Sequence, residues 1–265
     1  MKKANTPLAA ALFLAGSLAT NAASISVNIH INTNDANMVD AGESAFVGLA
    51  GAEVVDGANV NNYKVDTTSN QNNLVDNSGA STSVALADNS GYSSFVNNSF
   101  PNQATTGDAG LTQSAGFIND SEAYTLTNLN SFASSYTLIL LFEIGNDSGG
   151  ALKARNYGFT VNDGNGPQSV FTNDTASRDL DLTNDGSLEY LLASGGSIGA
   201  GTVDGNYAVF TGLSGDTLSI SGAQSSSRSP LLGFQVVSEV ASIPEPSISA
   251  LLGLGGVALI LRRRK

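Results

Sequence analysis

Hydrophobic and polar residues alternate in short runs along the middle of the chain. In Ser24–Ile31, Ile25 and Val27 point to one face of an extended strand, while Ser26 and His30 point to the other. Because side chains of a strand alternate between two faces, this run predicts a half-buried strand at an edge-like position. Comparable runs predict further strands at Ala123–Leu129, Tyr157–Val161, Ser169–Thr172, Tyr207–Thr211, Thr217–Ser221 and Leu231–Val237.

One run is different, because Tyr136–Ile144 is apolar almost throughout. A continuous apolar run of strand length is typical of a central strand that is covered on both faces. Turn-forming sequences separate the runs, for example Gly145–Gly150, Asn162–Pro167 and Asn184–Gly186. Many short strands joined by such turns predict an all-β fold, an antiparallel β-sandwich of jelly-roll-like form. We expect long loops with a few short strands at 59–116.

Both ends of the chain depart from this pattern. Lys2 and Lys3 precede an apolar run at Leu8–Leu18, and small residues follow at Thr20 and Ala22. This order is typical of a secretory signal peptide cleaved near Ala22; the alternative is a buried helix of the mature fold. Such a leader would pass through the secretion translocon.

The other end holds a second apolar run. Two prolines two residues apart favour an extended segment, and an apolar stretch with a basic end follows. We therefore predict a signal peptide at 1–22, a sandwich at 24–237, a linker at 238–247, a transmembrane helix at 248–261 and a cytoplasmic tail at 262–265. The basic residues Arg262, Arg263, Arg264 and Lys265 would stop translocation and keep the tail inside, so that the sandwich faces outward.

This ending resembles the PEP-CTERM sorting signal. The matching parts are the motif Pro244, Glu245, Pro246 and Ser247, the glycine-rich apolar stretch, and the terminal arginines. The resemblance implies that an exosortase-type membrane peptidase processes the motif, in a bacterium that makes exopolysaccharide or biofilm matrix. It also implies an intermediate anchored in the inner membrane and a final place at the cell surface or in the matrix. A plain single-pass anchor is the alternative, with the same topology.

The net negative charge of the predicted sandwich excludes one class of binding partner. Of the 11 Lys and Arg residues, six lie at the two ends, which leaves five in the middle against all 23 Asp and Glu residues. An acidic body is repelled by phosphate backbones, so a nucleic-acid partner is not expected. The chain has no Cys, which excludes disulfides and cysteine-based metal sites.

Candidate catalytic and metal sites are few. Gly195–Gly199 fits the G-x-S-x-G pattern, but the only His, His30, lies far upstream and no helix follows, so a glycine-rich loop explains it better. The loop beginning at Asp181 starts like a calcium loop, yet its twelfth position is Leu192. Calcium at a sandwich loop would use Asp179, Asp181, Asp185 or Glu189; an acidic hairpin turn is the alternative.

These observations predict a non-catalytic exported protein of the cell surface or matrix that has no cofactor. The alternative is a carbohydrate-binding module of the cell surface, either dependent on calcium or independent of it. The absence of Trp weighs against sugar-stacking subsites. An enzyme is a third reading, without a catalytic constellation to support it.

Overall fold

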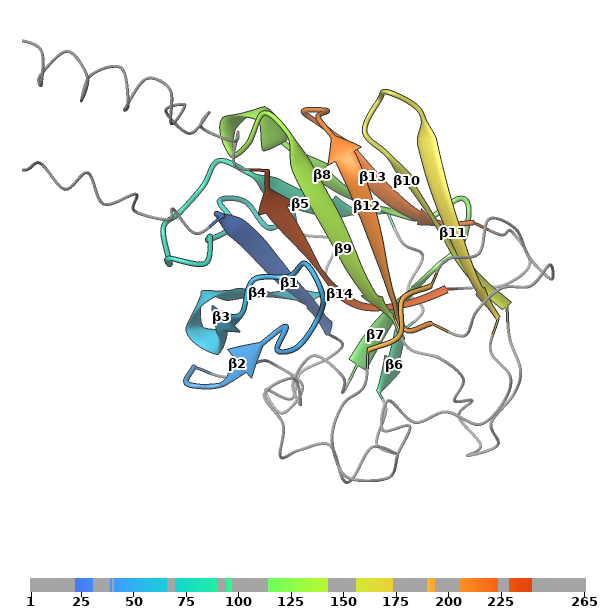
Figure 1. The fold of residues 1–265 in the computed structure, drawn as a ribbon, viewed down its shortest axis with the longest axis horizontal. Coiled ribbons are helices and arrows are strands. Elements are labelled where there is room, and N and C mark those ends of the chain that lie inside the picture. The colour runs from blue at the N-terminus through green and yellow to red at the C-terminus, as the bar shows by residue number, and fades with distance from the viewer. Residues whose placement is uncertain are drawn as a thin grey trace, which may run out of the picture.

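The computed structural model describes residues 22–30, 39, 41–65, 70–89, 94–96, 114–142, 156–173, 190–193, 205–223 and 229–239. These residues form two β-sheets that pack face to face as a sandwich (Figure 1). The mostly β composition and the packing confirm the expected fold class, and they are consistent with a jelly-roll-like form. The predicted transmembrane helix, the basic tail, the candidate calcium residues and nearly all of the predicted signal peptide lie outside the described residues.

The first sheet is built around the last strand of the body. Its order is β12 (Tyr207–Leu213), β9 (Tyr136–Phe142), β14 (Ser229–Ser238), β1 (Ser24–His30) and β4 (Val60–Lys64). At one end β7 (Ser114–Ile118) also pairs with β14, and β6 (Ser94–Val96) pairs with β7. β14 therefore has a neighbour on each side along most of its length.

The second sheet is antiparallel throughout its described pairs. Its order is β11 (Pro167–Asn173), β10 (Asn156–Asn162), β13 (Leu218–Gly222), β8 (Ala123–Thr127) and β5 (Ala85–Asp88). A small third sheet joins β2 (Ser44–Ala45) to β3 (Val55–Asp56). Two 3₁₀ helices are also present, η2 (Gly57–Asn59) and η3 (Leu129–Ser131).

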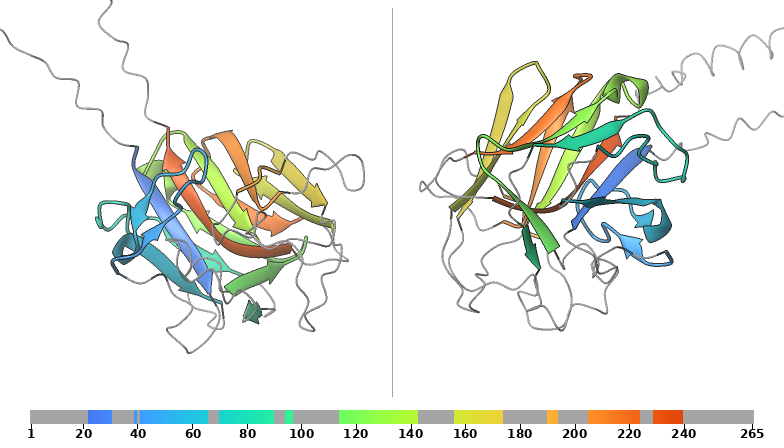
Figure 2. Two further views of the ribbon diagram at one scale, coloured as in Figure 1. Left: turned by 60° about the horizontal axis from the view of Figure 1, so that its bottom comes forward. Right: turned by 180° about the vertical axis from the view of Figure 1, so that it is seen from behind.

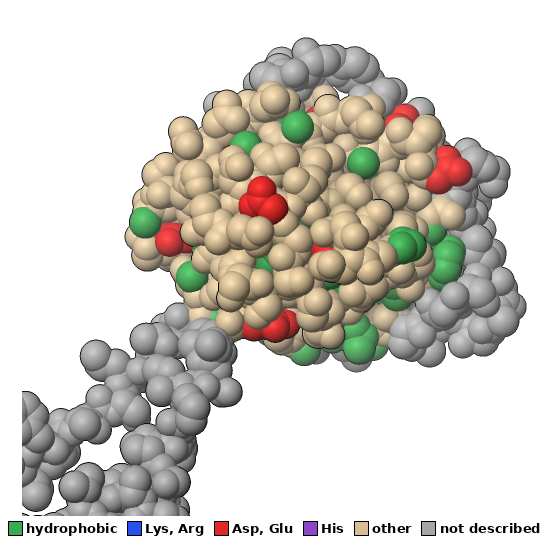
Figure 3. All heavy atoms as spheres, turned by 90° about the horizontal axis from the view of Figure 1, so that it is seen from above, with side chains coloured by type: hydrophobic (Ala, Val, Ile, Leu, Met, Phe, Trp, Pro, Cys, Tyr) green, Lys and Arg blue, Asp and Glu red, His purple; other side chains and the backbone are tan. Residues whose placement is uncertain are grey.

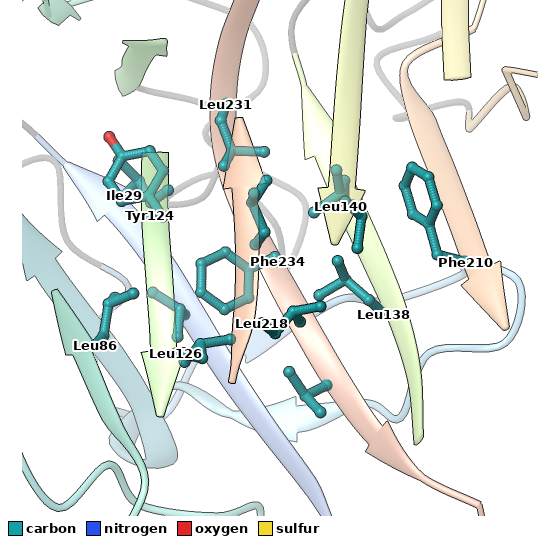
Figure 4. Close-up of a cluster of buried hydrophobic side chains, with 14 of the residues drawn as sticks. Ile29, Leu86, Tyr124, Leu126, Leu138, Leu140, Phe210, Leu218, Leu231 and Phe234 are labelled. Carbon is teal, nitrogen blue, oxygen red and sulfur yellow. The ribbon is translucent and has the colours of Figure 1, made fainter. Parts of the chain in front are cut away.

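The main core fills the space between the two large sheets (Figure 4). Tyr124 and Leu126 of β8 point into it, as the alternating run predicts, and Phe234 of β14 meets them from the opposite sheet. β9 is buried on both faces, because Leu138 and Leu140 enter this core while Ile139 packs on the other side of the sheet. The prediction of a central, doubly covered strand at this place is confirmed.

All eight predicted strands are present with bounds within two residues of those expected. The turn at 162–167 uses the predicted chemistry, since Gly164 and Gly166 have φ values of 90° and 131°. Between residues 59 and 116 the described strands are short, as expected.

Two expectations about β1 are wrong. The strand is not edge-like, because β14 and β4 flank it, and it is not half-buried, because all seven of its residues are buried. Residues 41–59, which we call the covering segment, lie over its polar face and form a second core. That core consists of Val39, Ala45, Phe46, Leu49, Val55, Val60, Ile139, Leu141, Tyr207, Leu232 and Val237.

Hydrogen bonds lower the free-energy cost of burying the polar face of β1. Gln235 Nε2 donates to Ser26 Oγ at 2.8 Å, and Asn28 Nδ2 donates to Asn62 Oδ1 at 2.9 Å. A buried polar group costs little free energy when it has such a partner, so an alternating strand can still lie in the interior. The sandwich is also not wholly antiparallel, because β1 and β4 run parallel from Ser26↔Val60 to His30↔Lys64.

Candidate functional site

The first and last strands of the body lie side by side. β1 pairs with β14 from Ser24↔Val237 to Asn28↔Gly233, and the backbone N–H of Ser238 donates to the carbonyl of Ala23 at 2.8 Å. The two strands are neighbours in both further views (Figure 2). The chain therefore enters and leaves the folded body at the same end of one sheet.

Asn77 fixes the entry point, in a set of contacts we call the entry clamp. Its Nδ2 donates to the carbonyl of Ala22 at 3.2 Å, and its Oδ1 accepts from the N–H of Ser24 at 3.3 Å. Its own N–H donates to the carbonyl of Ser24 at 2.8 Å. These bonds hold the backbone on either side of Ala23, next to the predicted cleavage site.

Asp76 makes the turn under the entry clamp rigid. Its Oδ1 accepts from the N–H of Ser78 at 2.9 Å, the hydroxyl of Ser78 at 2.6 Å and the N–H of Ala80 at 3.0 Å. Burial alone would raise the pKa of Asp76, but these hydrogen bonds outweigh burial and hold the pKa below its ordinary value. Gly79, with φ of 80°, takes the left-handed position that closes the turn.

Glu239 fixes the exit point, in contacts we call the exit clamp. Its N–H donates to the carbonyl of Ser135 at 3.0 Å, so the ladder between β14 and the start of β9 continues to the last described residue. Its Oε1 accepts from the hydroxyl of Thr137 at 3.1 Å and from the N–H of Gly212 at 3.3 Å.

An irregularity in β12 places one of these donors. The pairing of β12 with β9 shifts between Phe210 and Leu213, which is the mark of a β-bulge. Gly212 lies in the bulge with φ of 71°, a conformation that glycine adopts without a steric cost. Its N–H thus donates to Glu239, three residues before position 242.

The sequence that follows the exit clamp identifies the type of C-terminal signal. Residues 242–265 match the model of the PEP-CTERM protein-sorting motif. The protein carries a PEP-CTERM sorting signal. The match confirms the resemblance proposed from sequence, and it includes the motif Pro244, Glu245, Pro246 and Ser247 together with the basic cluster at 262–265. No curated protein and no solved structure matches the chain.

The PEP-CTERM signal shows that the protein is exported and sorted to the cell surface, and that an exosortase is the kind of enzyme that recognises it. The motif residues themselves lie outside the described part of the chain. In the described part, no helix has the length and hydropathy that crossing a membrane requires.

The other predicted sites are not brought together by the described residues. Asp179, Asp181, Asp185 and Glu189 lie outside them, as does the Gly195–Gly199 loop. Within the described ranges no group of three or more His, Cys, Asp or Glu residues is placed to hold a metal ion. His30 is the last residue of β1, where it pairs with Lys64 of β4 and is 4% exposed.

Sequence reasoning missed both clamps. Asp76–Gly79 is recognisable as a turn, but nothing in the sequence indicates that Asn77 reaches a strand more than fifty residues away. Glu239 is an ordinary polar residue after a strand, and its two donors, the Thr137 hydroxyl and the Gly212 N–H in the bulge, come from distant parts of the chain.

Proposed function

We propose that this protein is a non-catalytic component of the cell surface or extracellular matrix, exported through the secretion translocon and processed at its C-terminus by an exosortase. The PEP-CTERM motif at 242–265 is the observation that carries the proposal. The body is held first by the apolar stretch at 248–261 and is then released or transferred when the Pro-Glu-Pro region is processed.

The exit clamp supports this order of events. The described part of the body ends at Glu239, and eight residues separate it from the predicted membrane helix at 248. An extended residue spans at most about 3.3–3.6 Å, so these eight residues reach no more than about 30 Å. With residues 248–261 in the membrane, the body would stay within that distance of the membrane in which an exosortase acts.

Mass spectrometry of the protein from the cell surface tests the processing step. We expect the mature C-terminus to lie in or near Pro244–Ser247, and Glu245→Ala to abolish maturation while the chain still inserts in the membrane. Asp120→Ala is the matched control, because it removes an exposed carboxylate of the body outside the motif. A mature surface protein that still ends in Lys265 would contradict processing and leave a plain anchor.

The basic cluster has a separate role. Deletion of 262–265 removes the charges that hold the tail in the cytoplasm, and it leaves Pro244–Ser247 intact. We expect a larger fraction of the protein in the culture medium with its signal unprocessed, measured by fractionation and immunoblotting. Unchanged retention of the deletion variant would show that the arginines do not fix the topology.

The acidic body bears on the choice of matrix partner. With five basic residues against 23 acidic residues between the two ends, the body is repelled by acidic polymers. In the view of Figure 3 the described surface shows a few separate carboxylates and no Lys or Arg side chain. A neutral exopolysaccharide is therefore the expected partner in a matrix or biofilm.

Binding of the purified protein to the exopolysaccharide of its own source, with and without calcium, separates a structural component from a carbohydrate-binding module. Saturable binding would favour the module, and a requirement for calcium would place the ion in that interaction. Activity screening of the same preparation tests the absence of catalysis, and turnover of any glycan or peptide substrate would contradict it.

A further inference from the structure

β14 holds the first sheet together although it is the last strand of the body. It pairs with β1 from Val237 to Gly233, and with β9 from Leu231 to Ser238. Nine of its ten residues are buried, so the strand contributes side chains to both cores as well as two ladders of hydrogen bonds. Without β14, the pair β1–β4 has no contact with the pair β9–β12 within the sheet.

During export, the two strands that must pair, β1 and β14, emerge from the membrane at opposite ends of the process. A chain that crosses the membrane from its N-terminus presents β1 first and β14 last. β1 must therefore wait for nearly the whole body before its antiparallel partner arrives, and the backbone edge that pairs with β14 lacks its ladder until then. Closure of the first sheet is a long-range pairing, which is a late event in folding because the intervening loop must first be ordered.

Closure also changes the environment of the predicted cleavage site. In the folded body the carbonyl of Ala22 accepts from Asn77, and the carbonyl of Ala23 accepts from the N–H of Ser238. The N–H and carbonyl of Ser24 both bond to Asn77. A peptidase requires a segment whose backbone is free to enter its active site, so a segment paired on both sides is cut only when it opens.

We infer that docking of β14 is a switch that completes the body and, in the same step, closes the Ala22–Ala23 bond to signal peptidase. Removal of the signal peptide therefore precedes folding of the first sheet. The C-terminal signal becomes the sole tether of the folded body once that sheet has closed. The exit of the sorting signal is fixed at that moment, because Ser238 ends the docked strand and Glu239, the next residue, bonds to Thr137 at the start of β9.

The test uses the full-length precursor in detergent micelles with purified signal peptidase. Val236→Asp places a charge in the main core, where Val236 is 0% exposed, and prevents β14 from docking. Val54→Asp is the matched control, since Val54 is 57% exposed in the covering segment. The product is measured by its new N-terminus in mass spectrometry, and folding is followed by circular dichroism.

We expect the Val236→Asp precursor to be cleaved about tenfold faster or more than the folded wild type, and the Val54→Asp precursor at the wild-type rate. Asn77→Ala, which opens the entry clamp and leaves β14 in place, should accelerate cleavage by a smaller factor while the protein stays folded. Equal rates for folded wild type and Val236→Asp would overturn the inference. The readout is at the N-terminus, so it is independent of whether an exosortase processes the other end.

Discussion

One buried carboxylate, that of Asp163, connects two turns at one end of the sandwich. Asp163 is 6% exposed, and its oxygens accept from the N–H groups of Asn165, Ser214 and Gly215 at 3.0, 2.9 and 3.3 Å and from Asn165 Nδ2 at 2.8 Å. Tyr136 donates to the carbonyl of Gly215 beside it, and burial raises the pKa of that phenol. One side chain therefore joins the β10–β11 turn to the β12–β13 turn.

The contribution of Asp163 to stability should decrease as the pH falls. Burial alone would raise the pKa of Asp163, but the hydrogen bonds outweigh it and hold the pKa below its ordinary value of 3.8. A carboxyl with a depressed pKa in the folded state stabilises the protein above that ordinary value, and its contribution is lost as pH falls below it. We expect Asp163→Asn to lower the free energy of unfolding at pH 7 by about 1–3 kcal/mol.

Urea titrations at pH 7 and at pH 3 measure both effects. The difference between Asp163→Asn and wild type should shrink at the lower pH, because pH 3 lies below the ordinary pKa of 3.8 and the carboxyl of the unfolded wild type is then mostly protonated, which stabilises the unfolded state relative to the folded one. Asp216→Asn, at an exposed position in the same turn, is the control. A difference that stays constant with pH would show that the charge of Asp163 does not stabilise the junction.

At the scale of elements, the covering segment buries the outer face of the first sheet. Gln235 of β14 attaches it, since the N–H of Glu53 donates to Gln235 Oε1 and Gln235 Nε2 donates to the carbonyl of Glu53, both at 2.8 Å. The side-chain amide of Gln235 thus exchanges two hydrogen bonds with the backbone of Glu53, as a residue of a neighbouring β-strand would do with its backbone. It satisfies the amide of Gln235, which would otherwise be buried without partners.

Removing the amide should detach the covering segment without unfolding the sandwich. We expect Gln235→Ala to cost about 2–4 kcal/mol, because it leaves two backbone groups of Glu53 unsatisfied and opens a cavity. Amide hydrogen exchange at Glu53 and its neighbours should accelerate more than exchange in β9. Gln168→Ala, at an exposed position, should change neither, and uniform acceleration throughout the sandwich would contradict a local role.

The strands were predictable because period-two alternation and apolar runs are local signals. Tyr124 and Leu126 reveal their shared face from the sequence alone, and the continuous run of β9 reveals its two covered faces. The sequence did not reveal what covers Ser26 and Asn28, because their partners Gln235 and Asn62 come from distant strands. Alternation reports which residues share a face, and it does not report whether that face meets water or another polar layer.

The sorting signal was predictable for a related reason. Its parts lie next to one another in the chain, so order and composition suffice to recognise Pro244–Ser247 and the basic cluster. The clamps at Asn77 and Glu239 depend on contacts between segments that are remote in sequence, and no local pattern encodes them.

At the scale of the whole molecule, the position of β14 sets where the chain can be cut. A chain that ends after Glu239 keeps every strand that the structure describes, and we expect it to be secreted as a folded, soluble body with a cooperative thermal transition. A chain that ends at residue 228 lacks β14, and we expect it to be degraded or to aggregate. Equal yields of the two truncated proteins from the periplasm would show that β14 is dispensable.

Calcium binding by the acidic loop at 179–189 can be tested through the thermal stability of the whole protein. Clustered carboxylates repel one another, and a bound cation would relieve that repulsion and stabilise the folded state by mass action. If the acidic loop holds an ion, we expect the Tm to rise in millimolar calcium relative to chelator, and Asp181→Asn with Asp185→Asn to abolish the rise. An unchanged Tm for the wild type would remove calcium from the proposed function.

The central place of β14 also has a mechanical consequence. While the protein is tethered by its C-terminus, any drag on the body is transmitted through Glu239 into β14. A pull along the strand axis loads the ladders to β1 and β9 in shear, because antiparallel hydrogen bonds lie perpendicular to the strands and must yield together. A strand at the edge of the sheet would share the load with one neighbour, whereas β14 shares it with two. The same arrangement that delays folding therefore makes the tethered strand more resistant to force than an edge strand such as β12 or β4.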